Sequence, residues 1–205
     1  MGQDSCDAGT VWSALEAIGT LSAVVVALFG DRIAGWLWQP KLQVTLNNPA
    51  GTRTWLESEG KNALYFHLRV ENTRAVKAEN VTVMVTRVEQ GSERDGFECV
   101  FRDVPVPLAW PFHEPRERDV YGHMPELCDL GRLVQGGEGF YLSAKHLPNN
   151  FPNVVRPGMT TRYALCVWGS NFKVKDEIVI QIHLDRDKWT GPGSSLSALS
   201  VKVVA

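Results

Sequence analysis

The sequence lacks the short motifs that would assign it to a common enzyme class. It contains no H-E-x-x-H, no G-x-S-x-G, no P-loop and no G-x-G-x-x-G after a predicted strand, so the usual signatures of zinc proteases, serine hydrolases, NTPases and dinucleotide-binding proteins are missing. The five histidines show no spacing that a strand or helix would make convergent on a metal ion. We therefore expect a protein that is not an enzyme and that has no metal site and no cofactor.

The sequence also lacks the closely spaced cysteine pairs that bind metal ions, and it has no surplus of basic residues. Cys6, Cys99, Cys128 and Cys166 form no C-x-x-C pair, and the apolar surroundings of Cys166 predict a small core residue. Twenty-one basic and 23 acidic residues give a net charge of −2. Binding to the phosphates of nucleic acid would need a basic face, so we expect no nucleic-acid partner.

One long apolar run is present, and it lies near the N-terminus. Residues 17–30 carry no charge, and extending the run back to Val11 adds only Glu16. About 20 predominantly apolar residues are what a helix needs to cross a hydrocarbon core of ~30 Å. The run therefore predicts a transmembrane helix, with the lipid bilayer as a partner.

Tryptophans mark both ends of this predicted helix. Trp12 lies at one end and Trp36 and Trp38 at the other, where indole rings prefer the headgroup level of a bilayer. Pro40 has no N–H with which to continue a helix. We expect three segments: a tail at residues 1–10, a membrane helix at 11–39 and one folded domain at 41–205.

Charges near the helix ends predict its orientation. Asp4 and Asp7 precede the helix without any basic residue, whereas Arg32 and Lys41 follow it. The positive-inside rule then places the C-terminal domain in the cytoplasm.

Small and polar residues follow one side of the predicted helix. This stripe includes Glu16, Thr20, Ala23, Ala27 and Gly30. Small side chains allow close approach of two membrane helices, so the stripe predicts self-association into a homo-oligomer. A carboxylate near the hydrocarbon is costly, and Glu16 would face a partner helix or a water-filled lumen; alternatively, it lies just below the headgroups on a solitary helix.

After Pro40 the hydrophobic pattern changes to a period of two, which is typical of half-buried strands. Turn sequences such as Gln135–Gly137 and Arg156–Gly158 separate the runs. The expected strands are 42–46, 64–70, 81–85, 97–101, 140–144, 161–168, 178–184 and 199–204. Strands without crossover helices favour antiparallel pairing, so we predict a mainly β domain, an immunoglobulin-like β-sandwich, with a compact β-barrel as the alternative.

One stretch, Pro105–Glu126, breaks the alternation with five prolines. Its aromatic and cationic residues suit an anionic ligand with a planar group, such as a nucleotide-like molecule. The alternative is an edge crossover whose Trp110 and Tyr121 plug the sandwich and whose charges are solvated. The candidate ligand-binding residues are Trp110, His113, Arg116, Arg118, Tyr121 and His123.

A second charged stretch, Asp185–Lys188, offers the alternating carboxylates that calcium prefers, but it lacks the glycine and the distant glutamate of a calcium loop. We interpret it as a charged turn after which Trp189 folds back onto the core.

Three segments carry a resemblance: VWSALEAIGTLSAVVVALFGDRIAGWLWQPKLQV, YFHLRVENTRAVKAENVTVMVTRV and ELCDLGRL. Together they resemble uncharacterised small bacterial single-pass membrane proteins with an N-terminal helix and a C-terminal β-sandwich. The resemblance implies a bacterial inner-membrane location. More loosely, the layout is similar to membrane effectors of antiphage signalling systems, in which a β-domain senses a nucleotide signal and membrane helices, often two, assemble.

These patterns leave two functions to compare. The first is a membrane-anchored sensing or interaction module, whose β-domain binds a ligand or protein partner while the helix self-associates to perturb the membrane in defence. The second is a passive anchored scaffold that positions a cytoplasmic partner. An enzyme is a distant third alternative.

Overall fold

The computed structural model describes residues 16, 18–20, 22–24, 27–29, 38–111, 117–172, 177–189 and 195–204. The chain divides into two compact units, residues 1–39 and 40–205.

The described residues of the first unit between Glu16 and Phe29 are helical and exposed. Two hydroxyls bond within the helix: Thr20 Oγ1 donates to the Glu16 carbonyl at 2.9 Å, and Ser22 Oγ donates to the Ile18 carbonyl at 2.7 Å. In the part of the chain that the structure describes, no helix is both long enough and apolar enough to cross a membrane. Most of the segment at 11–39 lies outside the described residues, so the transmembrane helix stays a prediction.

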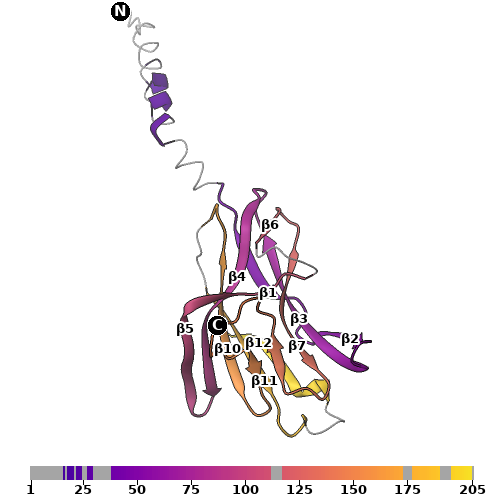
Figure 1. The fold of residues 1–205 in the computed structure, drawn as a ribbon. Coiled ribbons are helices and arrows are strands. Elements are labelled where there is room, and N and C mark those ends of the chain that lie inside the picture. The colour runs from indigo at the N-terminus through magenta and orange to yellow at the C-terminus, as the bar shows by residue number, and fades with distance from the viewer. Residues whose placement is uncertain are drawn as a thin grey trace, which may run out of the picture. The chain divides into compact units, whose positions relative to one another are not determined.

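The second unit is built from strands (Figure 1). The described strands are β1 (Leu42–Leu46), β2 (Thr52–Leu56), β3 (Lys61–Asn72), β4 (Ala78–Ser92), β5 (Gly96–Pro107), β6 (Arg118–Val120), β7 (Glu126–Val134), β8 (Phe140–Leu142), β9 (Val154–Val155), β10 (Thr160–Trp168), β11 (Ile178–Leu184) and β12 (Leu199–Val204), with one 3₁₀ turn at Leu196–Ala198.

These strands form two antiparallel sheets. One has the order β1-β3-β7-β8-β9, and the other has the order β12-β11-β10-β4-β5. The long strands β3 and β4 each carry two shorter partners along one edge: β1 and β2 share an edge of β3, and β5 and β6 share an edge of β4. The prediction of a mainly β, antiparallel domain is confirmed, and all eight expected runs contain strand.

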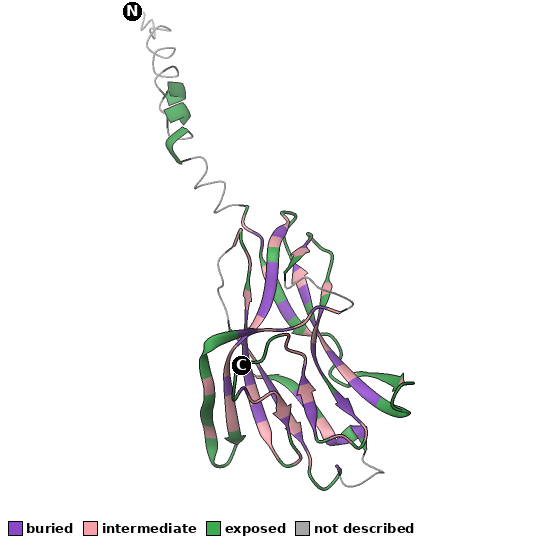
Figure 2. Cartoon of the chain, viewed as in Figure 1, coloured by how far each residue is buried: buried purple, intermediate pink, exposed green. Residues whose placement is uncertain are grey.

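The core contains apolar residues from both sheets, because alternate side chains of a strand point to the same face. β3 contributes Phe66 and Leu68, β10 contributes Tyr163, and β11 contributes Ile180 and Ile182, each at most 1% exposed. Figure 2 shows this alternation along the central strands, whereas the edge strands β2 and β5 are mostly exposed.

The stretch Pro105–Glu126, where the alternation of the sequence is broken, contains no central strand at its start but does contain edge-strand residues. Pro105 and Pro107 belong to β5, and Arg118–Val120 forms β6. Proline is tolerated in β5 because this strand lies at the edge of its sheet, where a missing donor does not interrupt a ladder.

A buried asparagine fixes the point at which the chain enters the β-domain. Asn72, at the end of β3, is 0% exposed. Its Oδ1 accepts bonds from the Lys41 and Arg74 N–H groups at 3.3 and 3.1 Å, and its Nδ2 donates to the carbonyls of Val76 and Val120 at 2.6 and 3.4 Å. This side chain therefore joins the entering chain, the β3–β4 loop and β6.

Candidate ligand pocket

The predicted binding residues of the stretch before β7 occupy different environments. Trp110 is 3% exposed and belongs to the core, and its Nε1 has no hydrogen-bond partner among the described residues. Tyr121 is 53% exposed, so it does not plug the sandwich. His113 and Arg116 lie outside the described residues.

The two remaining candidates of this stretch serve structural contacts. Arg118 pairs with Glu126 at 3.2 Å. His123 has a φ of 60°, and its backbone N–H donates to the Asn72 carbonyl at 2.8 Å. The structure does not bring Trp110 and Tyr121 together on one surface, because one is buried and the other is exposed; a ligand site in this stretch stays a prediction.

Of the residues predicted for helix self-association, Glu16, Thr20, Ala23 and Ala27 are described as helical and exposed, and Gly30 lies outside the described residues. Their assembly stays a prediction.

A pocket of about 670 Å³ lies at the end of the β-domain where β3 begins. This volume falls within the roughly 300–1,000 Å³ of small-ligand sites. Residues at the ends of strands from both sheets form its wall: Gly60 lies in the β2–β3 turn, Lys61 begins β3, and Trp189 lies in the segment after β11. The full lining is Gly60, Lys61, Gln135, Gly136, Gly137, Pro157 and Trp189.

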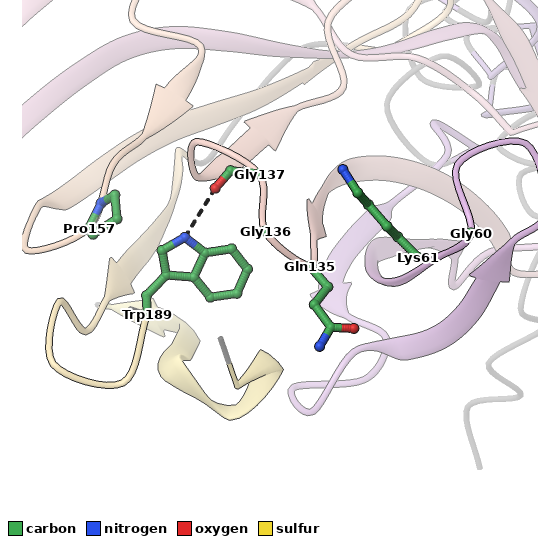
Figure 3. Close-up of a pocket in the computed structure, with 7 residues that line it drawn as sticks. All are labelled: Gly60, Lys61, Gln135, Gly136, Gly137, Pro157 and Trp189. Atoms are coloured by element: carbon green, nitrogen blue, oxygen red, sulfur yellow. Dashed lines mark hydrogen bonds between the residues drawn. The ribbon is translucent and has the colours of Figure 1, made fainter. Parts of the chain in front are cut away.

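The indole of Trp189 is held in place by the preceding turn. Asp185 Oδ1 accepts bonds from the Asp187 and Lys188 N–H groups at 3.0 and 3.4 Å, and the Trp189 N–H donates to the Asp185 carbonyl at 3.1 Å. Trp189 is 7% exposed, and its Nε1 donates to the Gly137 carbonyl at 3.2 Å (Figure 3). The prediction that Trp189 folds back after a charged turn is confirmed.

The opposite wall comes from the turns that flank β3 and β7. The Gln135 N–H donates to the Asn62 carbonyl at 2.9 Å, and Gln135 Oε1 accepts from Asn62 Nδ2 at 3.3 Å. These contacts fix the Gln135 carboxamide against Asn62, which follows Lys61 in β3. Gly136 has a φ of 74°, so the turn after β7 favours glycine at this position. Figure 3 shows Lys61 and Gln135 across the pocket from Trp189.

The lining of this pocket contains one cationic side chain, that of Lys61. None of its lining residues is acidic, and Lys61 forms no ion pair with a described carboxylate. The guanidinium of Arg186 packs against Gly158, next to the lining residue Pro157. Burial would raise the pKa of the nearby Asp185, but bonds from the Lys188 side chain and from backbone N–H groups outweigh it and lower that pKa. Asp185 therefore stays a carboxylate engaged within its own turn.

Other polar and nucleophilic groups make structural contacts. On β3 and β7, His67 Nε2 lies 3.2 Å from Asp129 Oδ1; burial raises the pKa of Asp129, and His67 opposes this effect. Burial also raises the pKa of the Cys128 thiol, which keeps it protonated and unreactive.

Cys166 is 5% exposed, as expected for a core residue. The described residues contain no cluster of three or more His, Cys, Asp or Glu side chains fit to hold a metal.

The sequence contained a partial signal for the pocket. Gln135–Gly137 and Arg156–Gly158 are both recognisable as turns, and Trp189 is recognisable as a residue that returns to the core. What pattern alone did not reveal is that these turns converge with Lys61. No protein-family model matches the chain, and a search of curated proteins finds no significant match.

Proposed function

We propose that this chain is a membrane-anchored sensing module, in which residues 11–39 anchor an immunoglobulin-like β-domain that binds an anionic, nucleotide-like ligand in the pocket of Lys61 and Trp189. The protein belongs, in this proposal, to a bacterial inner membrane, with the β-domain in the cytoplasm. The proposed class of ligand rests on one observation. Lys61 has no described carboxylate partner and lines a pocket together with the indole of Trp189, and no acidic side chain lines this pocket.

The pocket offers two complementary contacts. An ammonium group binds phosphate or carboxylate through charge-assisted hydrogen bonds. The Trp189 indole is 7% exposed and fixed through Gly137, and it gives the pocket an apolar wall that the edge of a base can contact. The Gln135 side chain adds polar atoms that orient a ligand.

AMP tests this proposal as a probe with both a base and a phosphate, and adenosine and inorganic phosphate separate the two contributions. Equilibrium dialysis of the full-length protein in detergent should show AMP binding that exceeds binding of either fragment. Lys61→Met keeps the side-chain stem and removes the charge, and it should weaken AMP binding about tenfold, which corresponds to ~1.4 kcal/mol.

Lys202→Met is the matched control, because Lys202 pairs with Glu93 at 3.1 Å and does not line the pocket. It should bind AMP as the parent does. Equal AMP binding by Lys61→Met and the parent would refute the site, and no binding of any of the three probes would favour the passive scaffold instead.

A further inference from the structure

Four large apolar side chains are exposed at the end of the β-domain where the chain enters. Val76 lies in the β3–β4 loop, Tyr121 and Met124 follow β6, and Trp168 ends β10. Their exposed fractions are 38%, 53%, 61% and 47%, respectively. We refer to these four residues as the entry patch.

Backbone contacts place the first three residues on adjoining loops. Gly122 pairs with Asn72, and a Cβ on Gly122 would lie 2.7 Å from the Cα of Ala75. The β3–β4 loop, which carries Val76, therefore lies directly against the turn that carries Tyr121 and Met124.

Trp168 is tied to the same end through the loop that follows it. The Asn171 side chain donates to the Lys77 carbonyl at 2.8 Å and accepts from the Glu79 N–H at 2.9 Å. Because Lys77 directly follows Val76, the loop after Trp168 lies at the same end of the domain as the other three residues, and the Trp168 indole itself donates to Cys166 Sγ at 2.9 Å.

Several charged groups at this end form ion pairs. Lys77 pairs with Asp119 at 3.0 Å and with Glu79 at 3.2 Å, and Arg118 pairs with Glu126 at 3.2 Å. Lys77, through its hydrogen bond, lowers the pKa of Asp119, so this carboxylate stays charged and paired. An apolar surface with paired charges and with Trp and Tyr side chains is what the headgroup level of a bilayer accepts.

The predicted membrane segment ends just before the chain enters the β-domain. Asn72 bonds to the Lys41 N–H at 3.3 Å, and Lys41 lies two residues after Gln39, the end of the predicted membrane segment. We propose that the entry patch docks on the lipid interface, an inference that rests on the membrane anchoring proposed above. The bilayer is then the partner, and the domain is held against it rather than tethered loosely.

Docking would also set the position of the ligand pocket. β3 runs from Lys61, beside the pocket, to Asn72, beside the entry patch. The eleven steps from the first to the last of its 12 residues span about 36 Å. With the entry patch on the lipid, the pocket faces the aqueous phase at the far end of β3.

The test uses full-length protein in phosphatidylcholine vesicles that contain a nitroxide-labelled lipid. In a Cys6→Ser, Cys99→Ser background, an environment-sensitive fluorophore is attached to Met124→Cys, and in a second sample to Glu57→Cys in the exposed β2–β3 turn. Cys128 and Cys166 are buried and remain in place. We expect a blue shift and nitroxide quenching at position 124, and neither effect at position 57.

A second variant measures the contribution of the patch itself. Tyr121→Asp should reduce the quenching at position 124, whereas Trp55→Asp, a matched change of an exposed aromatic on β2, should leave it unchanged. A fluorophore at 124 that is as solvated as the one at 57, in protein that stays with the vesicles after alkaline extraction, overturns docking and leaves anchoring intact.

Two other outcomes are distinguishable. Protein released from the vesicles by alkaline extraction refutes the anchoring and docking proposals together. A fluorophore at 124 that is shielded from iodide but not quenched by the nitroxide lipid shows that protein covers the patch, which also overturns lipid docking.

Discussion

Replacing Asn72 with aspartate tests whether one buried side chain holds the entry end of the β-domain together. The change keeps the shape and the Oδ1 acceptor but removes the Nδ2 group, which donates to the carbonyls of Val76 and Val120 at 2.6 and 3.4 Å. Both carbonyls would then face a carboxylate in a position that is 0% exposed.

The expected cost follows from these contacts. A buried polar group that loses its partner costs about 1–3 kcal/mol. Two groups are affected, and the bond at 3.4 Å is the weaker of the two, so we expect Asn72→Asp to lower the free energy of unfolding by about 3 kcal/mol at pH 7. This is a large part of the ~5–15 kcal/mol that a domain possesses.

Protonation should reverse part of the loss. Burial and the two facing carbonyls raise the pKa of the introduced carboxyl group in the folded variant above its unfolded value, so the folded state binds the proton more tightly. The destabilisation should therefore shrink as the pH falls towards the unfolded pKa of about 4 and should be largest at neutral pH.

Urea unfolding of the full-length protein in detergent, followed by tryptophan fluorescence at several pH values, measures both effects. Asn48→Asp is the matched control: Asn48 makes similar local bonds, from Nδ2 to the Gly51 carbonyl at 2.8 Å and from the Ala50 N–H to Oδ1 at 3.0 Å, but it is exposed. It should cost no more than about 0.5 kcal/mol. Equal costs for the two variants would refute the reasoning.

Two further predictions concern the membrane segment. Ala23→Ile or Ala27→Ile should weaken self-association of the isolated helix in a bacterial two-hybrid assay, because a bulky side chain separates two backbones, whereas isoleucine at Leu21 or Val25 should not; association as strong as that of the parent would reduce the helix to an anchor. Reporter fusions to the C-terminus should show a cytoplasmic β-domain, because Arg32 and Lys41 follow the segment. A periplasmic reporter signal would contradict this orientation.

Strands with clean alternation were predictable from the sequence, whereas β2, β7 and the two short strands β6 and β9 were not. β2 has four exposed residues out of five, so burial imposes no pattern on it. In β7, a register shift opposite Phe66 and His67 adds a residue between Asp129 and Gly131. The extra residue, Leu130, and Leu133 after it are both buried, although they are an odd number of positions apart. A pattern with a period of two therefore does not detect this strand.

The pocket was less predictable than the strands, for a physical reason. Its lining comes from segments that lie far apart in the chain, such as those of Lys61 and Trp189. The hydrophobic periodicity of one segment does not show which distant segments it meets in the fold. Composition instead directed attention to Trp110, whose ring the fold buries. An aromatic residue in an irregular stretch is ambiguous, because packing and binding use the same side chain.

The irregular edge of β5 affects whether two copies of this protein can pair strand to strand. Two register shifts interrupt its pairing with β4, Asp103 has a φ of 78°, and Pro105 and Pro107 each lack a donor. A strand edge broken in these ways is a poor template for a strand from another molecule. In the membrane-anchored protein proposed above, copies would meet at high local concentration, and β5 would then protect the domain from growing into a continuous intermolecular sheet.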